Sequence, residues 1–138
     1  MKTFISLLII LTSVSCVSQK KQQTNSIEEI IFNAQTRGAM ENIKLAGKNL
    51  EYKTYSDSKS LLINDEQKNK LYDLIKKIDL TKLSEFKVSS ENRASDRAMH
   101  ATFTIKTDKQ TYTSNQFDDN NPPEELKKII ELLRSFVD

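Results

Sequence analysis

Residues 98–137 read AMHATFTIKTDKQTYTSNQFDDNNPPEELKKIIELLRSFV, and this stretch decides the fold. From Met99 to Ile105 the apolar residues occupy every second position, which is the period of a half-buried strand. Asp108 and Lys109 interrupt the pattern and predict a turn between two antiparallel strands. The turn sets the cross-strand pairs: Ile105–Tyr112 and Phe103–Ser114 on an apolar face, and Thr104–Thr113, Thr102–Asn115 and His100–Phe117 on a polar face.

An amphipathic helix is predicted to follow this hairpin directly. Asn121 suits the N-cap, Pro122 the first helical position, and Glu124 the third position of a capping box. Six apolar residues then recur at intervals of mostly three and four, which predicts one buried stripe: Leu126, Ile129, Ile130, Leu133, Phe136 and Val137. The stretch therefore predicts strand, strand, helix, with the helix on the apolar face of the sheet.

The first 15 residues have the pattern of a secretory signal peptide. Lys2 gives a positive start, an apolar run follows to Leu11, and Ser13-Val14-Ser15 is a small-x-small cleavage site. The apolar run is far shorter than the ~20 residues of a membrane-spanning helix. We therefore expect residues 1–15 to be removed on export.

Cys16, the single cysteine of the chain, comes directly after this site. The position resembles the lipobox of bacterial lipoproteins, although Ser13 stands where that motif usually has leucine. The resemblance implies a diacylated Cys16 as the mature N-terminus; an ordinary signal peptidase would instead leave a free thiol there. Residues 16–26 are mostly polar and predict a tether between this cysteine and the folded domain.

A second hairpin is predicted earlier in the chain, around Gly47 and Lys48, with glycine where a type II′ turn needs it. Its pairs are Leu45–Leu50 and Ile43–Tyr52 on one face, and Lys44–Glu51 and Asn42–Lys53 on the other. Before it, residues 29–34 alternate like a strand, although the Ile-Glu-Glu-Ile-Ile start also fits a helix.

A helix is predicted to open at Asn64 with a capping box to Gln67 and to bury Leu71, Leu74, Ile75 and Ile78. A short irregular or 3₁₀ segment follows from Leu80 to Phe86, and then a polar connection from Lys87 to Arg97. Together these elements predict one α+β domain over residues 27–138. We expect an antiparallel sheet of four or five strands with two helices on one face, in which strand-strand-helix occurs twice.

Composition restricts the function classes. The 21 Lys and Arg residues fall to 20 when Lys2 leaves with the signal, against 19 Asp and Glu, so nucleic acid is not an expected partner. Asp118 to Asn121 lack the alternate ligands and central glycine of a calcium loop, and we expect a strand-to-helix turn there instead. His100, the single histidine, has no motif that nominates a nucleophile or an orienting acid. We therefore expect no enzyme, metal or cofactor.

The polar connection offers the best candidates for contact with a partner, since ordered long loops often carry binding residues. In residues 93–97 Asp96 is expected to hold one of the two guanidinium groups, and His100 and Phe117 are expected at the adjacent sheet edge. The candidate contact residues are Arg93, Asp96, Arg97, His100 and Phe117.

Several short segments resemble landmarks of small uncharacterised lipoproteins of Bacteroidota: Thr36-Arg37-Gly38, Ser95-Asp96-Arg97-Ala98, Tyr112-Thr113-Ser114, Phe117-Asp118 and Asn121-Pro122-Pro123-Glu124-Glu125-Leu126. The resemblance implies a lipid-anchored protein on the periplasmic or outer surface of a bacterial cell envelope, with no assigned activity. We expect a non-enzymatic module that binds another envelope protein or a surface component. The alternative is a small-ligand carrier or an accessory subunit of an envelope enzyme, which would require a concave pocket.

Overall fold

The computed structural model describes residues 26–138. The expected signal peptide, Cys16 and the tether up to residue 25 lie outside the described residues. The described elements are β1 (Ile27–Gln35), β2 (Met40–Ala46), β3 (Asn49–Lys53), β4 (Ser58–Leu62), α1 (Asp65–Ile75), the 3₁₀ helices η1 (Leu80–Glu85) and η2 (Asn92–Ser95), β5 (His100–Thr107), β6 (Thr111–Thr113), β7 (Phe117–Asp118) and α2 (Glu124–Arg134).

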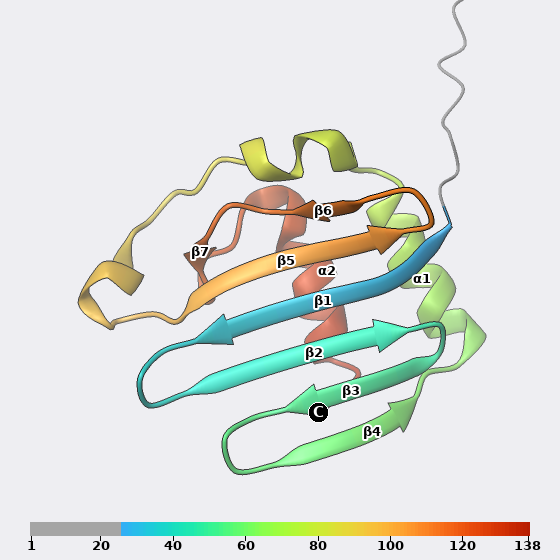
Figure 1. The fold of residues 1–138 in the computed structure, drawn as a ribbon, viewed down its shortest axis with the longest axis horizontal. Coiled ribbons are helices and arrows are strands. Elements are labelled where there is room, and N and C mark those ends of the chain that lie inside the picture. Colours follow the sequence, from blue (N-terminus) through green and yellow to red (C-terminus); the bar gives the residue numbers. More distant parts are fainter. Residues whose placement is uncertain (1–25) are drawn as a thin grey trace, which may run out of the picture.

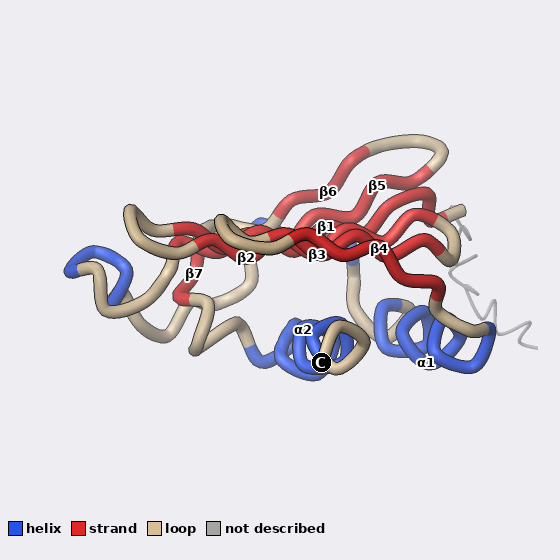
Figure 2. Tube along the Cα trace, turned by 90° about the horizontal axis from the view of Figure 1, so that it is seen from below, coloured by secondary structure: helices blue, strands red, loops and turns tan. Residues whose placement is uncertain are grey.

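The strands form a single antiparallel sheet in the order β4-β3-β2-β1-β5-β6, and β7 pairs with β5 (Figure 1). Both α-helices lie on one face of this sheet, and no helix of residues 26–138 covers the other, which we call the open face (Figure 2). The α+β class is therefore confirmed. The expected four or five strands are too few, because the sheet has seven strands and both β4 and the short β7 were missed.

The central strand β1 is held on both sides, by β2 and β5. Ile30, Phe32 and Ala34 alternate onto the helix-covered face and are fully buried. The helical alternative for this segment is wrong, because pairing with two neighbours satisfies the backbone of the strand along most of its length.

The β2–β3 hairpin has the predicted register, with Leu45 opposite Leu50 and Ile43 opposite Tyr52. Gly47 has φ +63° and Lys48 has no positive φ. This combination is the one that a two-residue II′ turn requires, because only its first central residue has φ above zero. Gly47 thus fits the turn that sets the register of the β2–β3 hairpin.

The last hairpin keeps its predicted register near the turn and loses it further along. Ile105 pairs with Tyr112, and Thr104 with Thr113. At Ser114 the side-chain oxygen accepts the Phe103 N–H at 2.9 Å and donates to the Asn115 carbonyl, and the chain leaves the regular ladder. When it returns as β7, Phe117 lies opposite Ala101 rather than His100. This one-residue shift turns Phe117 to the inner face, where it is fully buried.

The two α-helices begin differently. In α1, Asn64 is the N-cap and exchanges hydrogen bonds with Gln67, as predicted. In α2 the predicted Asn121 cap is wrong: the N-cap is Pro123, without a side-chain cap bond. Asn121 is already engaged, because its side-chain amide donates to Ser90 and its backbone N–H to the Asp118 carbonyl.

The core between sheet and helices is continuous. Leu126, Ile129, Ile130 and Leu133 of α2 are buried as predicted, and they share one cluster with Leu71 and Ile75 of α1 and with the inner side chains of β1, β2, β3 and β5. Arg134 fastens the end of α2 to the sheet. Its Nη2 lies 2.6 Å from Glu41 of β2, and its guanidinium stacks 4.9 Å from the centre of the Phe32 ring.

Candidate functional site

The open face of the sheet is mainly polar. Its side chains alternate with the buried ones along each strand: Glu29, Ile31, Asn33 and Gln35 on β1; Met40, Asn42, Lys44 and Ala46 on β2; Glu51 and Lys53 on β3; His100, Thr102, Thr104 and Lys106 on β5. Glu29 lies 3.1 Å from Lys44 and 2.6 Å from Lys106. Hydrogen bonds from Lys106 and Lys44 lower the pKa of Glu29, so the charges at this end of the open face, where β1 begins and β5 ends, are paired with one another.

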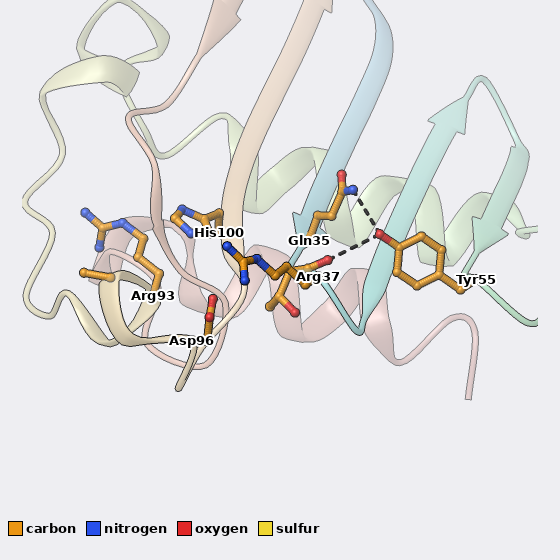
Figure 3. Close-up of a pocket in the computed structure, with 8 residues that line it drawn as sticks. Gln35, Arg37, Tyr55, Arg93, Asp96 and His100 are labelled. Carbon is orange, nitrogen blue, oxygen red and sulfur yellow. Dashed lines mark hydrogen bonds between the residues drawn. The ribbon is translucent and has the colours of Figure 1, made fainter.

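One end of the sheet is hollowed. The end hollow has a volume of about 640 Å³ and is open to solvent (Figure 3). Its lining comes from the β1–β2 turn, the β3–β4 turn, η2 and the start of β5, which lie at the same end of the sheet (Figure 1). Its lining residues are Gln35, Thr36, Arg37, Tyr55, Arg93, Ala94, Asp96 and His100. Segments that lie far apart in the chain therefore meet at one concave surface.

Of the two arginines that line the end hollow, Arg37 is the one without a partner among residues 26–138. It is exposed, and among the described residues it makes no hydrogen bond or ion pair. Its side chain extends toward His100 in Figure 3. Tyr55 borders the opposite side and is fixed there: its hydroxyl accepts from the Gln35 amide at 3.0 Å and donates to the Thr36 carbonyl at 3.3 Å. The turn that carries Arg37 is thus tied to the β3–β4 turn.

Asp118 fixes the other wall of the end hollow. This fully buried carboxylate accepts from Ser90 Oγ at 2.6 Å, from the backbone N–H groups of Asn92 and Arg93 at 2.7 and 3.1 Å, and from Arg93 Nη1 at 3.1 Å. Burial by itself would raise the pKa of Asp118, but these hydrogen bonds outweigh it and lower the pKa to about 2. A single carboxylate therefore orders the polar connection and orients η2.

The structure brings three of the five predicted contact residues together. Arg93, Asp96 and His100 all line the end hollow, whereas Arg97 is exposed but does not line it. The placement of Phe117 beside His100 is wrong, because the shift after Ser114 buries Phe117 in the core.

The expected partner of the guanidinium is wrong as well. Arg93 is held by Asp118, while the side chain of Asp96 makes no hydrogen bond within the described chain. Asp96 instead ends η2 with φ +55°, a left-handed conformation that Asp tolerates better than most residues.

Two residues of the end hollow, Arg37 and Tyr55, were missed as site residues. Each lies in or beside a turn far from residues 93–100 in the sequence. The sequence signal for Arg37 was its place in the Thr36-Arg37-Gly38 turn, but only the pairing of β1 with β5 puts that turn next to His100. Gln35 lies opposite His100 in this pairing.

The polar side chains of the end hollow supply mainly hydrogen-bond donors, from Arg37, Arg93, His100 and Tyr55. His100 makes no hydrogen bond to an acid or hydroxyl group among the described residues. No group of three or more His, Cys, Asp or Glu residues within 26–138 is placed to hold a metal ion. In residues 118–121, Asp118 accepts from residues 90–93 and Asp119 accepts the Met99 N–H at 2.6 Å.

No helix among the described residues is long and apolar enough to cross a membrane. No protein-family model, curated protein or solved structure matches the chain.

Proposed function

We propose that this protein is a lipid-anchored module of a bacterial cell envelope that binds another envelope protein or a surface component, and that the end hollow is its contact site. The observation that carries the proposal is the convergence of Arg37, Tyr55, Arg93 and His100 at one concave surface. Arginine and tyrosine are enriched at the energetic centres of protein interfaces.

Arg37 is the expected principal contact. An exposed guanidinium without a partner can form two parallel hydrogen bonds to a carboxylate, whereas Arg93 already uses Nη1 to bind Asp118 and the Ser90 carbonyl. His100 adds a donor or an acceptor beside it, and Tyr55 offers an exposed aromatic ring. The chemistry of the site thus fits an acidic group on the partner's surface.

The walls of the end hollow are preorganised. Asp118 fixes the segment that carries Arg93, and Tyr55 ties together the two turns on the other side. Binding to ordered walls costs less conformational entropy than binding to mobile loops. This rigidity supports recognition of a partner by a surface that is already formed.

The alternative, a small-ligand carrier, has less support. A carrier encloses most of its ligand in an apolar cavity, whereas the space between sheet and helices is occupied by one continuous core. The end hollow has the volume of a small-ligand site, but it is open and its lining is mainly polar.

The contact site is tested by photocrosslinking in intact envelopes. A photoreactive phenylalanine analogue is placed at Tyr55, and at Lys127 as the matched control, since Lys127 is exposed on α2 away from the end hollow. We expect a discrete adduct from position 55 and none from position 127. Equal adducts from both positions, or none from either, would contradict the proposal.

The anchor is tested separately. Cys16 follows a signal-type segment directly, so membrane-extracted protein should carry a diacylglyceryl adduct by mass spectrometry. Cys16→Ser should move the protein to the soluble fraction. If Cys16→Ser remains in the membrane and the wild-type cysteine is unmodified, the anchor proposal fails while the contact site stands.

A further inference from the structure

The edge strand β4 is the most exposed element of the sheet. All five of its residues are exposed, including Leu61 at 37% and Leu62 at 78%. At the other edge η1 packs beside the short β6, but nothing described lies beside β4 (Figure 1). Unpaired strand edges tend to recruit another strand, and soluble proteins usually blunt them with proline, bulges or several charges. Residues 58–62 contain a single lysine and no proline.

The backbone groups that face outward from β4 follow from its pairing with β3. The Thr54 N–H donates to the Asp57 carbonyl at one end of the hairpin, and the Ile63 N–H to the Lys48 carbonyl at the other. Hydrogen-bonded pairs alternate in an antiparallel ladder, so Tyr52–Lys59 and Leu50–Leu61 are the bonded pairs between them. The N–H and C=O groups of Ser58, Ser60 and Leu62 therefore point away from β3.

From this edge we infer that the protein forms a two-fold dimer through β4, with Leu61 of one copy opposite Leu61 of the other. The outward Ser58 N–H is already taken, because it donates to the Asp57 side chain at 2.8 Å. Within the described chain, the outward groups left free are the Ser58 C=O and the N–H and C=O groups of Ser60 and Leu62. An antiparallel pairing centred on Leu61 places Ser60 opposite Leu62 in both directions, so the four groups of Ser60 and Leu62 on each copy find partners and the Ser58 C=O stays in solvent.

The side chains fit the same register. Leu61 shares the inner face with Leu50, so the dimer would extend one apolar row across both copies, in the order Leu50, Leu61, Leu61 and Leu50. The single charge of the strand does not oppose it: Lys59 Nζ donates to the Val137 carbonyl at 3.2 Å and lies 5.5 Å from the centre of the Tyr52 ring. A second copy of this chain would therefore pair the free backbone groups of Ser60 and Leu62 and place Leu61 against an apolar partner.

The test is disulfide formation in the full-length protein. Directly opposite residues of a non-hydrogen-bonded pair have Cα atoms about 4.5 Å apart, so Leu61→Cys should form an intermolecular disulfide under mild oxidation. Lys59→Cys is the matched control on the same strand and face, because the two Lys59 positions are offset by about four residues, or about 14 Å. We expect at least about tenfold more disulfide dimer from Leu61→Cys than from Lys59→Cys, or from wild type with Cys16 alone.

Ser60→Pro, added to Leu61→Cys, removes an outward N–H without removing a bond to β3. It should abolish the disulfide while leaving the melting temperature close to that of Leu61→Cys. Equal yields from positions 59 and 61, or a yield unaffected by Ser60→Pro, would overturn the dimer. An intramolecular disulfide between Cys16 and the thiol introduced at position 61 would overturn it too, since the chain's own N-terminal segment would then occupy the edge.

Discussion

At the scale of single residues, Asp118 links β7 to the polar connection through four hydrogen bonds. A buried carboxylate is costly unless several donors satisfy it, and here two backbone N–H groups, a hydroxyl and a guanidinium do so. All four donors come from residues 90–93. The sequence had suggested only a turn for Asp118, because its partners lie 25 to 28 residues away and no local pattern identifies them.

Asp118→Asn keeps the size of the side chain and removes its charge. We expect it to lower the free energy of unfolding by about 2 kcal/mol at pH 7, since the pKa of Asp118 is shifted from 3.8 to about 2. A carboxylate whose pKa is lower in the folded state than in the unfolded chain stabilises the folded state at pH values above its pKa in the unfolded chain. This stabilisation is lost as the pH falls through the pKa of the folded state. The difference between wild type and Asp118→Asn should therefore shrink between about pH 4 and pH 2.

Urea denaturation at pH 7 and at pH 3 measures this difference. Asp96→Asn is the control, because the Asp96 side chain is exposed and has no partner among the described residues; its effect should stay within about 0.5 kcal/mol. An Asp118→Asn protein as stable as wild type at pH 7 would show that the carboxylate does not hold the polar connection.

At the scale of elements, the sequence correctly predicted the features that depend on a few neighbouring residues, namely one hairpin register and one helix start. Gly47 fixed one hairpin register and Asn64 fixed the start of α1. The strand β4 was missed because Ser58 to Leu62 show no apolar alternation; what makes this segment a strand is pairing with β3. The position of Phe117 was predicted wrongly because the Phe103 N–H bonds to the Ser114 side chain and one extra residue enters the return strand. A register counted from the turn assumes regular pairing and so places Phe117 one residue off.

The packing of α2 can be tested at Ile130, which is 1% exposed in the middle of the buried stripe. Ile130→Asp places a charge in the core without a partner, so we expect a loss of at least about 4 kcal/mol in the free energy of unfolding. Lys127→Asp on the exposed side of the same helix should cost less than about 1 kcal/mol. Thermal melting followed by circular dichroism compares the two, and equal melting temperatures would mean that α2 is turned the other way.

At the scale of the whole molecule, one face of the sheet forms the core with the helices, and one end of the sheet forms the end hollow. The helices cover one face, and the buried core residues of the described chain run from Ile30 to Val137. The end hollow could not be read from the sequence as a unit, because it depends on β5 crossing over to pair with β1 and so bringing His100 beside the turn that follows Gln35. Arg93, Asp96 and His100 were predicted as contact residues from the polar connection and the strand that follows it. Arg37 and Tyr55 join them only because the order of the strands brings two other turns to the same end of the sheet.

Since residues 30–137 form one continuous buried cluster, a chain starting at Ser26 should fold cooperatively. Ser26 is retained because its carbonyl accepts the Asp108 N–H at 3.0 Å. We expect its melting temperature to lie within about 2 °C of that of the full chain, in the same detergent or buffer, which corresponds to less than about 0.5 kcal/mol for a domain of this size. A broad, non-cooperative transition would show that the preceding residues contribute to the core.

The central claim is that the end hollow recognises a partner through Arg37. The most direct measurement is the affinity of the full-length protein for the partner identified by crosslinking, compared between Arg37→Glu and Lys127→Glu. Both variants make the same change of charge at an exposed residue, and only one lies in the end hollow. We predict at least about a tenfold loss of affinity for Arg37→Glu, or about 1.4 kcal/mol, and less than about a twofold change for Lys127→Glu. Equal affinities of the two variants would contradict the account.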